Sequence, residues 1–500
     1  MTGGNMELFE SEKKGRGLRA TRELQTGEVV LAEPSYSAVV FDSLAYQVCH
    51  SCFRRQAKLH RCTQCRFAHY CDRTCQTACW EEHKQECAAI RTLGFPPNQN
   101  VRLAARMMWR RKKDQGLASD GQLVAADLLQ DHLGDLPEEE LKKLQSDVDN
   151  LLKFCSIAAK HHSVEDIRHI FGVIRCNRLP LTDQRGRQDV GWGVFPSLSL
   201  VNHDCWPNCA VTFNHGNQSA VSSALHSKMR MELRALRKIS EGEELTFGYV
   251  DLLNLSADRQ QQLKERFHFD CSCQRCSQHA GDDLMSAAAE SKVSGQTWPS
   301  VQQPEALVHE VFVLDPQPPA DKVKEVTAFS KESLQKIEKA GTDGDYREAL
   351  KLSHECLEKQ ENVLADTHLL RLRVFGVATE ALSHLKKFSE AAEVARRMVE
   401  GYEKLLQPNN AQLGMAMMKA GVVHWHAGQV EAGHNLICKA YRILMATHGP
   451  NHSVTKDLEA MRSQTEKELK MLKEIDAGKK QPMAASSSAE ETAKGFLRKQ

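Results

Sequence analysis

The sequence has no long apolar run and almost no net charge. No stretch of apolar residues is long enough to span a bilayer. Lys and Arg number 66 and Asp and Glu number 65, which argues against a protein coated in positive charge for binding nucleic acid. The N-terminal stretch MTGGNMELFESEKKGRG lacks the apolar segment of a signal peptide, and Thr2 does not fit N-myristoylation. We therefore expect a soluble intracellular protein, with no membrane partner and at most weak direct binding to nucleic acid.

Cysteine, by contrast, is plentiful and unevenly distributed. Of the 17 cysteines, eight lie between Cys49 and Cys87 and three lie in the run CSCQRC at 271–276. In an intracellular chain, clustered cysteines are more typical of metal binding than of disulfides. The 500 residues are enough for several domains.

Local patterns divide the chain into strand-rich and helical parts. The segment GEVVLAEPSYSAVVF near the N-terminus and several segments between about 190 and 250, such as EELTFGYV, are typical of strands. Residues from about 100 to 175 and from about 320 to 475 have apolar residues at helical spacing. The two strand-rich parts are predicted to build one domain, into which the cysteine block is inserted.

A weak repeat is visible in the C-terminal helical part. Glu-Ala pairs recur at 348–349, 390–391 and 431–432, a period of about 42 residues. A helix pair in each unit would give an array like that of tetratricopeptide proteins, although the usual period is about 34. The polar tail after this part is expected to be disordered.

The first cysteine block predicts two zinc sites. Structural Zn²⁺ takes four Cys or His ligands, commonly supplied as close pairs. Four such pairs are present, and pairs at i, i+4 spacing can lie on short helices. Unliganded cysteines at this density and spacing are a poor alternative. The pairs are Cys49/Cys52, Cys62/Cys65, Cys71/Cys75 and His83/Cys87.

The run CSCQRC leaves a third site one ligand short. It supplies Cys271, Cys273 and Cys276, and a tetrahedral zinc needs a fourth ligand. The stretch VNHDCWPNC at 201–209 offers two candidates, Cys205 and Cys209. A metal held in this way would join two distant segments of the chain.

Several motifs of the sequence resemble those of a known protein family. NHDCWPNC at 202–209 and GEELTFGY at 242–249 resemble the two signature motifs of SET-domain protein-lysine methyltransferases, and GRGLRA at 15–20 resembles the start of that domain. The first cysteine block resembles the MYND zinc finger, and CSCQRC resembles the post-SET cysteines. The chain is identified as a member of the SET and MYND domain methyltransferases. The finger and the segment AQLGMAMMKAG are most similar to the striated-muscle branch of that family.

This resemblance implies a fold and a set of metal ligands. The fold is α+β: a β-rich SET domain split by an inserted MYND finger and a helical insert, then a post-SET zinc segment and an all-α TPR-like domain. Three structural zinc ions are implied. One would bind Cys49, Cys52, Cys71 and Cys75, the second Cys62, Cys65, His83 and Cys87, and the third Cys209, Cys271, Cys273 and Cys276.

The predicted domain boundaries follow from the same comparison. The SET domain comprises residues 1–48 and 190–252, interrupted by the finger at 49–87 and the helical insert at 88–189. The post-SET segment is 253–280, the linker 281–320, the TPR-like domain 321–475 and the disordered tail 476–500.

The resemblance also implies S-adenosylmethionine as the cofactor and names the residues around it. Tyr249 would be the catalytic residue, and the lysine channel would be lined by Leu179, Tyr249 and Phe267. The residues implied in cofactor binding are Lys14, Gly15, Arg16, Gly17, His132, Asn177, Asn202, His203, Tyr249 and Phe269.

Elementary chemistry agrees with these roles but does not force them. Methyl transfer needs a neutral amine aligned with the methyl group, and a desolvated channel lowers the pKa of lysine. Gly permits close approach of the backbone to a ligand. The structural alternatives are a core tyrosine at a strand end for Tyr249, a satisfied structural histidine for His203, and a solvated turn for residues 14–17.

Three positions depart from what relatives lead us to expect. Phe267 falls where a tyrosine is common, Leu179 where a phenylalanine is usual, and Trp192 is bulkier than expected beside the pocket. Loss of a hydroxyl removes one hydrogen bond, worth about 0.5–1.5 kcal/mol. We therefore hypothesise a roomier channel that permits multiple methylation.

Two functions remain open from the sequence. The first is a protein-lysine methyltransferase acting on histone H3 or on a muscle protein such as myosin, in transcription, muscle differentiation or sarcomere assembly. The second is a scaffold or chaperone-associated corepressor whose methylation is secondary. Family resemblance adds proline-rich peptides at the finger, where Tyr70 and Trp80 could contact them or pack around zinc, and an Hsp90-type chaperone. It also implies a monomer in nucleus and cytoplasm, at the sarcomere in muscle.

Overall fold

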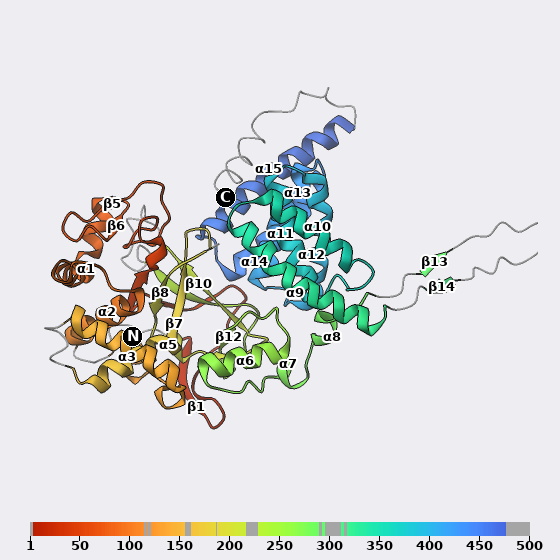
Figure 1. The fold of residues 1–500 in the computed structure, drawn as a ribbon. Helices are drawn as coiled ribbons and strands as arrows, with labels where there is room; N and C mark the ends of the chain where they lie inside the picture. Colours follow the sequence, from red (N-terminus) through yellow and green to blue (C-terminus); the bar gives the residue numbers. More distant parts are fainter. Residues whose placement is uncertain are drawn as a thin grey trace, which may run out of the picture. The chain divides into compact units, whose positions relative to one another are not determined.

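The computed structural model describes residues 4–114, 118, 122–155, 162–186, 188–216, 229–289, 293–295, 312–314 and 318–476. The chain divides into two compact units. Unit 1 comprises Met1–Leu252, Ala257–Cys276 and Ile443–Asp457, and unit 2 comprises Leu253–Ser256, Ser277–Arg442 and Leu458–Gln500. Unit 1 combines strands and helices, and unit 2 is largely helical (Figure 1). The predicted tail beyond Asp476 and most of the predicted linker at 281–320 lie outside the described residues.

The strands of unit 1 form several short sheets. An antiparallel sheet of order β10-β11-β3 contains β3 (Val29–Glu33), β10 (Cys209–Asn214) and β11 (Arg230–Ala235). A second, of order β4-β8-β7, contains β4 (Ser37–Val40), β7 (Arg178–Thr182) and β8 (Asp189–Val194). A hairpin joins β1 (Met6–Ser11) to β2 (Gly15–Ala20), and β9 (Asn202–His203) pairs in parallel with β12 (Thr246–Phe247).

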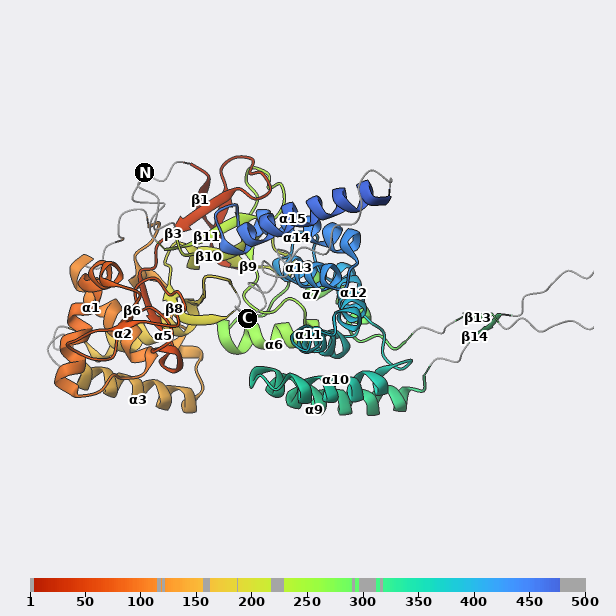
Figure 2. The ribbon, with the colours of Figure 1, turned by 90° about the horizontal axis from the view of Figure 1, so that it is seen from above.

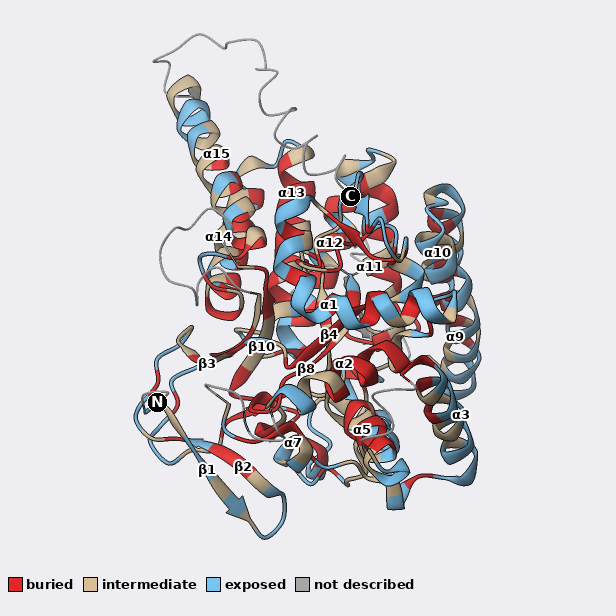
Figure 3. Cartoon of the chain, turned by 90° about the vertical axis from the view of Figure 1, so that its left-hand side faces the viewer, coloured by how far each residue is buried: buried red, intermediate tan, exposed pale blue. Residues whose placement is uncertain are grey.

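Unit 1 also contains helices. They are α1 (Arg73–Leu93), α2 (Gln99–Asp114), α3 (Glu138–Phe154), α5 (Val164–Asn177), α6 (Ser256–Phe267) and α7 (Gln274–Ser277). Of these, α2 packs against β4 and α5 against β7. The sequence explains where two of them begin: Asp72 accepts from the Cys75 amide at the start of α1, and Ser163 and Asp166 form a capping box on α5. The strands and the inner faces of α2 and α5 make the buried core, which is red in Figure 3. Short 3-10 turns include η2 (Ala126–Leu128) and η3 (Leu133–Asp135).

The finger differs in one respect from the prediction. Short helices were expected for the last two ligand pairs, but one 21-residue helix, α1, carries Cys75, His83 and Cys87, while Cys71 lies just before it. A small hairpin of β5 (His60–Arg61) and β6 (His69–Tyr70) packs against this helix. Helix α1 runs past the expected end of the finger at residue 87 and ends at Gly94, whose φ of 89° favours glycine.

Unit 2 is an array of consecutive antiparallel helix pairs. Figure 2 shows α9 and α10 lying side by side. The repeat seen in the sequence has a structural basis, because each Glu-Ala pair falls in the first turn of an even-numbered helix, where Ala349 and Ala391 are fully buried. The helices are α9 (Ala320–Thr342), α10 (Tyr346–Gln360), α11 (Leu369–His384), α12 (Phe388–Leu405), α13 (Ala411–His426), α14 (Val430–Thr447) and α15 (Ser453–Asp476). The end of α14 and the start of α15 belong to unit 1.

In the third repeat the small residue at the helix contact is Gly433, where an added Cβ would lie 2.8 Å from the carbonyl oxygen of Gly421. At this contact, glycine on both helices lets the two backbones approach closely. Unit 2 also contains the short helix α8 (Asp282–Met285) and the pair β13 (Val293–Gly295) and β14 (Phe312–Leu314). Among the described helices, none has both the length and the apolar character needed to cross a membrane.

Gly191 provides a test of the β4-β8 packing. A Cβ added there would overlap the carbonyl oxygen of Val39 on the neighbouring strand. We expect Gly191→Ala to lower the free energy of unfolding by about 1–3 kcal/mol, because the strands must separate to make room. Thermal unfolding of the zinc-loaded protein measures this. Gly134→Ala is the matched control, since a Cβ there meets no atom within 4 Å; equal midpoints for both variants would contradict the packing.

Candidate active site

The two signature motifs meet through the parallel pairing of β9 with β12. Thr246 lies opposite Asn202, and Phe247 lies opposite His203. Just beyond this pair, the backbone N–H of Tyr249 donates to Nδ1 of His203 at 3.0 Å. Segments that are about forty residues apart in the sequence are therefore fixed side by side.

Tyr249 is held by its hydroxyl as well as by its backbone. Its hydroxyl donates to the carbonyl oxygen of Val201 at 2.6 Å. Burial raises the pKa of this hydroxyl above its usual value, so it stays protonated at neutral pH. The arrangement places a neutral hydroxyl and a backbone carbonyl next to each other at one point of the site.

Aromatic rings surround Tyr249. Ring centroids lie 4.8 Å away in Phe267, 4.9 Å away in Phe247 and 6.4 Å away in Phe269. His203 packs 5.3 Å from Tyr249, and burial lowers its pKa to about 4. Because Nδ1 of His203 accepts from a backbone amide, its Nε2 carries the proton and faces the Cys205 sulfur at 3.2 Å. The Tyr249 ring is therefore packed mainly against aromatic rings, and the neighbouring His203 is neutral.

A polar wall lies on the other side of Asn202. Its side-chain amide donates to the carbonyl oxygen of Arg16 at 3.2 Å and to Glu244 at 2.9 Å. Lys14 forms an ion pair of 2.7 Å with the same carboxylate. Glu244, which the sequence analysis did not single out, thus joins Lys14 to Asn202. Its position in GEELTFGY was visible, but the pattern gave no sign of this contact.

Gly17 and Gly15 are glycines for two different structural reasons. A Cβ at Gly17 would lie 2.8 Å from Nδ2 of Asn202 and 2.8 Å from the ring of Phe9, so only glycine permits this close approach. The packing of Asn202 and Phe9 against the chain thus requires glycine at position 17. Gly15 has a φ of 69° at the turn between β1 and β2, and an added Cβ there would meet nothing within 4 Å.

A loop of residues 126–135 connects further predicted residues. The Arg16 guanidinium donates to the carbonyl oxygen of Leu128 at 2.6 Å, and the Asn177 amide donates to that of Gln130 at 2.9 Å. His132 lies in the same loop and pairs with Asp135 at 3.0 Å. Three predicted cofactor residues on separate elements are therefore linked through one loop.

The lysine channel is less clearly defined. Phe267 lies directly against Tyr249, whereas Leu179 lies on β7 opposite Gly193 and packs on the core. Trp192 packs edge-on against Phe41 at 5.1 Å and beneath the Arg178 guanidinium at 4.5 Å. The roles of Leu179 and Trp192 in the channel stay predictions.

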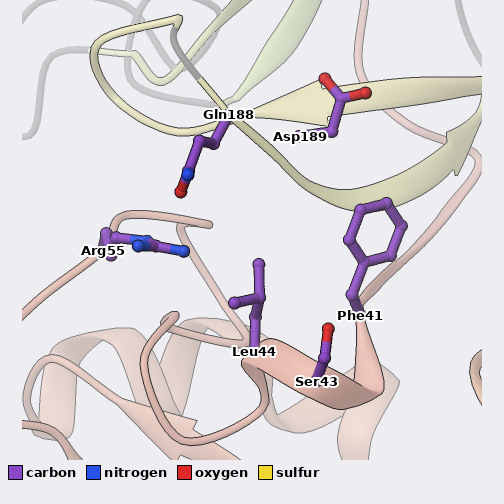
Figure 4. A pocket seen from close by; sticks show the side chains of 6 residues that line it. All are labelled: Phe41, Ser43, Leu44, Arg55, Gln188 and Asp189. Carbon is purple, nitrogen blue, oxygen red and sulfur yellow. The ribbon is translucent and has the colours of Figure 1, made fainter. Parts of the chain in front are cut away.

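A pocket elsewhere in unit 1 is distinct from this site. Figure 4 shows it between the turn that follows β4 and the start of β8. It is lined by Phe41, Ser43, Leu44, Arg55, Gln188 and Asp189, and none of the predicted cofactor residues is among them.

Three clusters of Cys and His ligand atoms fit three zinc ions. Within each cluster the four atoms lie within 4.8 Å of one another. Tetrahedral zinc with bonds of about 2.3 Å needs sulfurs about 3.8 Å apart. The separations agree: 3.6 Å for Cys52–Cys71, 3.9 Å for Cys62–Cys87 and 3.5 Å for Cys205–Cys276. The clusters are Cys49, Cys52, Cys71, Cys75; Cys62, Cys65, His83, Cys87; and Cys205, Cys271, Cys273, Cys276.

The third cluster corrects one prediction, since it contains Cys205 in place of Cys209. Cys205 lies in the loop after β9, with its sulfur facing the post-SET segment. Cys209 begins β10, opposite Ala235, and its side chain is buried in the hydrophobic core.

Polar residues around two of the clusters were not predicted. The His83 ring lies 3.0 Å from Glu86, which in turn pairs with the buried Arg106 at 2.6 Å. A carboxylate behind a zinc-bound histidine fixes its orientation and tautomer. At the third cluster, buried Arg259 approaches the Cys205 sulfur at 3.3 Å and lies near the excess negative charge of four thiolates. Nothing in the sequence distinguished these residues from surface charges.

Comparisons with known proteins bear on the same residues. Residues 15–250 match the SET domain. Histone-lysine N-methyltransferase Smyd1 of Mus musculus is 54% identical over 470 residues, 94% of this chain and 91% of that protein. SMYD1 of Homo sapiens is 53% identical over the same shares. SMYD3 of Mus musculus is 28% identical over 91% of this chain and 96% of that protein.

The fold, the paired motifs and these similarities define a SET-domain protein-lysine methyltransferase. The chain belongs to the family of SET and MYND domain-containing lysine methyltransferases, and it is similar along most of its length to the striated-muscle member. The predicted fold class and reaction class are thereby confirmed, as are S-adenosylmethionine as cofactor and three structural zinc ions. Its substrates are protein lysines.

Metal analysis tests the corrected ligand set. We expect Cys205→Ala to reduce bound zinc from three ions to two per chain, because three thiolates leave the third site incomplete. Cys209→Ala is the matched control and should retain three, since its sulfur faces the core. Elemental analysis of folded, dialysed protein measures the ratio. Loss of zinc in the Cys209 variant but not in the Cys205 variant would reverse the assignment.

Proposed function

We propose that the cofactor and the substrate lysine meet at Tyr249. The cofactor would lie against residues 14–17, the 126–135 loop, Asn177, Asn202, His203 and Phe269. The observation that carries this proposal is the 2.6 Å hydrogen bond from Tyr249 to the Val201 carbonyl beside the paired motifs. It brings a neutral hydroxyl and a fixed backbone carbonyl together among aromatic rings.

The aromatic surroundings support a role in preparing the amine. S-adenosylmethionine supplies a methyl group on a positively charged sulfur, and only a neutral amine can attack it. Rings of Phe247, Phe267 and Phe269 pack around Tyr249 and reduce the contact of this point with water. Such desolvation lowers the pKa of a lysine that enters. The Tyr249 hydroxyl and the Val201 carbonyl oxygen can then orient the amine through hydrogen bonds.

The polar wall supports a role in holding the amino-acid end of the cofactor. Asn202 is oriented by Glu244 and by the Arg16 carbonyl oxygen, so its amide is positioned before any ligand arrives. Lys14 offers a positive charge, but it is already paired with Glu244. A cofactor carboxylate would therefore have to share Lys14 with this side chain.

The next point is which proteins carry the lysine that is methylated. Since the similar Smyd1 proteins are named histone-lysine methyltransferases, we include histone H3 as a substrate here, together with muscle proteins such as myosin. A nuclear and cytoplasmic location, with the sarcomere in muscle, accords with both. Roles in transcription and muscle differentiation follow from the same reasoning.

Partner binding at the finger and at unit 2 has weaker support. Trp80 is 41% exposed and could contact a proline-rich peptide, but Tyr70 is 1% exposed and packs edge-on against His83. Only Trp80 therefore supports peptide binding at the finger. An Hsp90-type chaperone tail at the helix pairs of unit 2 stays a family-based proposal.

Removal of the Tyr249 hydroxyl separates catalysis from a scaffold role. We expect Tyr249→Phe to lower methyl transfer on the order of a hundredfold, because one oriented donor is lost at the reacting centre. A labelled-methyl assay on histone H3 and on a protein array measures the rate. Tyr46→Phe, at a residue that is 70% exposed, is the control and should be unaffected. If a cellular effect of the protein survives Tyr249→Phe, that effect belongs to a scaffold; an undiminished methylation rate would contradict the assignment of Tyr249.

The number of methyl groups tests the role of Phe267. We expect wild type to form di- or trimethyl-lysine. Phe267→Tyr should shift the product toward monomethyl-lysine, since it adds a hydroxyl to a ring whose centroid lies 4.8 Å from that of Tyr249 and so narrows the channel. Mass spectrometry of the best peptide from the array reports the product. Phe95→Tyr, at an exposed position, is the control. Only monomethyl product from the wild type would count against the roomier channel.

A further inference from the structure

His268 has a side-chain nitrogen with no partner at the edge of the proposed cofactor site. Its Nε2 is buried, and no hydrogen-bond partner for it exists among the described residues. Leaving a buried polar atom unpaired costs about 1–3 kcal/mol, and such atoms call for an explanation such as an absent ligand. Nothing in the sequence analysis singled out this histidine.

The backbone at His268 turns at the end of α6. Its φ is 60°, in the left-handed region, and its backbone N–H donates to the carbonyl oxygen of Lys264 at 3.1 Å. His268 directly follows α6, so this conformation caps the C-terminus of the helix. It leads the chain from the helix into the post-SET segment that carries Phe269.

The ring of His268 stacks on a second histidine, His132, with ring centroids 5.2 Å apart and an angle of 24° between the planes. Asp135 in turn holds Nδ1 of His132 at 3.0 Å. The stack thus joins the post-SET segment to the 126–135 loop.

That loop is anchored from several directions. It accepts hydrogen bonds from Arg16 and Asn177, and His169 approaches Asp131 at 2.7 Å and the carbonyl oxygen of Asp127 at 3.0 Å. On the other side of the stack, Phe267 contacts Tyr249, and Phe269 lies 6.0 Å from His203. The unpaired nitrogen therefore lies where segments bearing most of the proposed cofactor residues converge.

We propose that His268 is a cofactor-binding residue whose Nε2 forms a hydrogen bond with the adenosyl part of S-adenosylmethionine, while its stack on His132 holds the ring in place. This assignment rests on the proposed function and adds a residue to it. A ribose hydroxyl or a base nitrogen is the matching group, because either one can complete the hydrogen bond that the protein leaves unmade. The sulfonium and the amino-acid end of S-adenosylmethionine would instead lie against Asn202 and residues 14–17.

Calorimetry with the zinc-loaded full chain tests the assignment without relying on turnover. The probes are S-adenosylhomocysteine and, by competition, adenosine. His268→Phe keeps a flat ring for the stack but removes the nitrogen, and we expect about three- to tenfold weaker binding of both probes. His268→Gln keeps a polar atom near the same place and should stay within about twofold of wild type. It also serves as the test if the Phe variant does not fold.

His279→Phe is the matched control. His279 is an exposed histidine with a φ of 49°, so the substitution imposes the same backbone strain away from the stack. We expect it to bind both probes like the wild type. Unchanged affinity of His268→Phe, equal losses in the Phe and Gln variants, or a loss confined to S-adenosylhomocysteine would overturn the adenosyl contact. If the wild type binds neither probe, the proposed cofactor site itself is wrong.

Discussion

The short parallel pairing of β9 with β12 is the constraint on which the site depends. Only two residues of each strand pair, yet the hydrogen bonds that Tyr249 makes to His203 and Val201 extend the contact beyond the strands. Without this register the tyrosine would have no fixed carbonyl beside it, and Asn202 would not reach Glu244. A pairing this short is marginal by itself, so the surrounding core and the third zinc cluster must stabilise it.

The third zinc cluster restrains the site because its ligands lie close in the sequence to residues of the site. Phe267 and Phe269 lie only four and two residues before Cys271, and Cys205 lies two residues after His203. Zinc held by Cys205 and the post-SET thiolates therefore fixes both the polar motif and the aromatic residues over Tyr249. Since metal binding contributes folding free energy directly, a site on two distant segments can be rigid without an extensive sheet.

Much of the fold and of the candidate site could be predicted from the sequence, because ligand spacings and signature motifs are formed by residues that are close together in the chain. Twelve zinc ligands were predicted from the cysteine pairs and the family resemblance, and eleven of them lie in the clusters. The exception is Cys209, whose predicted place is taken by Cys205. Both are cysteines within residues 201–209, so the sequence alone does not distinguish them. The partners Glu86, Arg259 and Glu244 could not be predicted, since each is one charged residue among many until tertiary contacts select it. The same holds for the His132–His268 stack, which joins residues 136 positions apart.

The described contacts of the proposed cofactor site are made mostly to the backbone, whereas those of the proposed lysine channel are made by side chains. Tyr249, Asn202, Arg16 and Asn177 each donate to a carbonyl oxygen, and a substitution at the accepting residue leaves that oxygen in place. By contrast, Phe267, Leu179 and Trp192 would contribute only their side chains to the proposed channel. Changes at these three positions can therefore alter rate, product number or substrate choice while the methyl-transfer chemistry is retained, which is why their departure from related sequences does not weaken the assignment of the reaction.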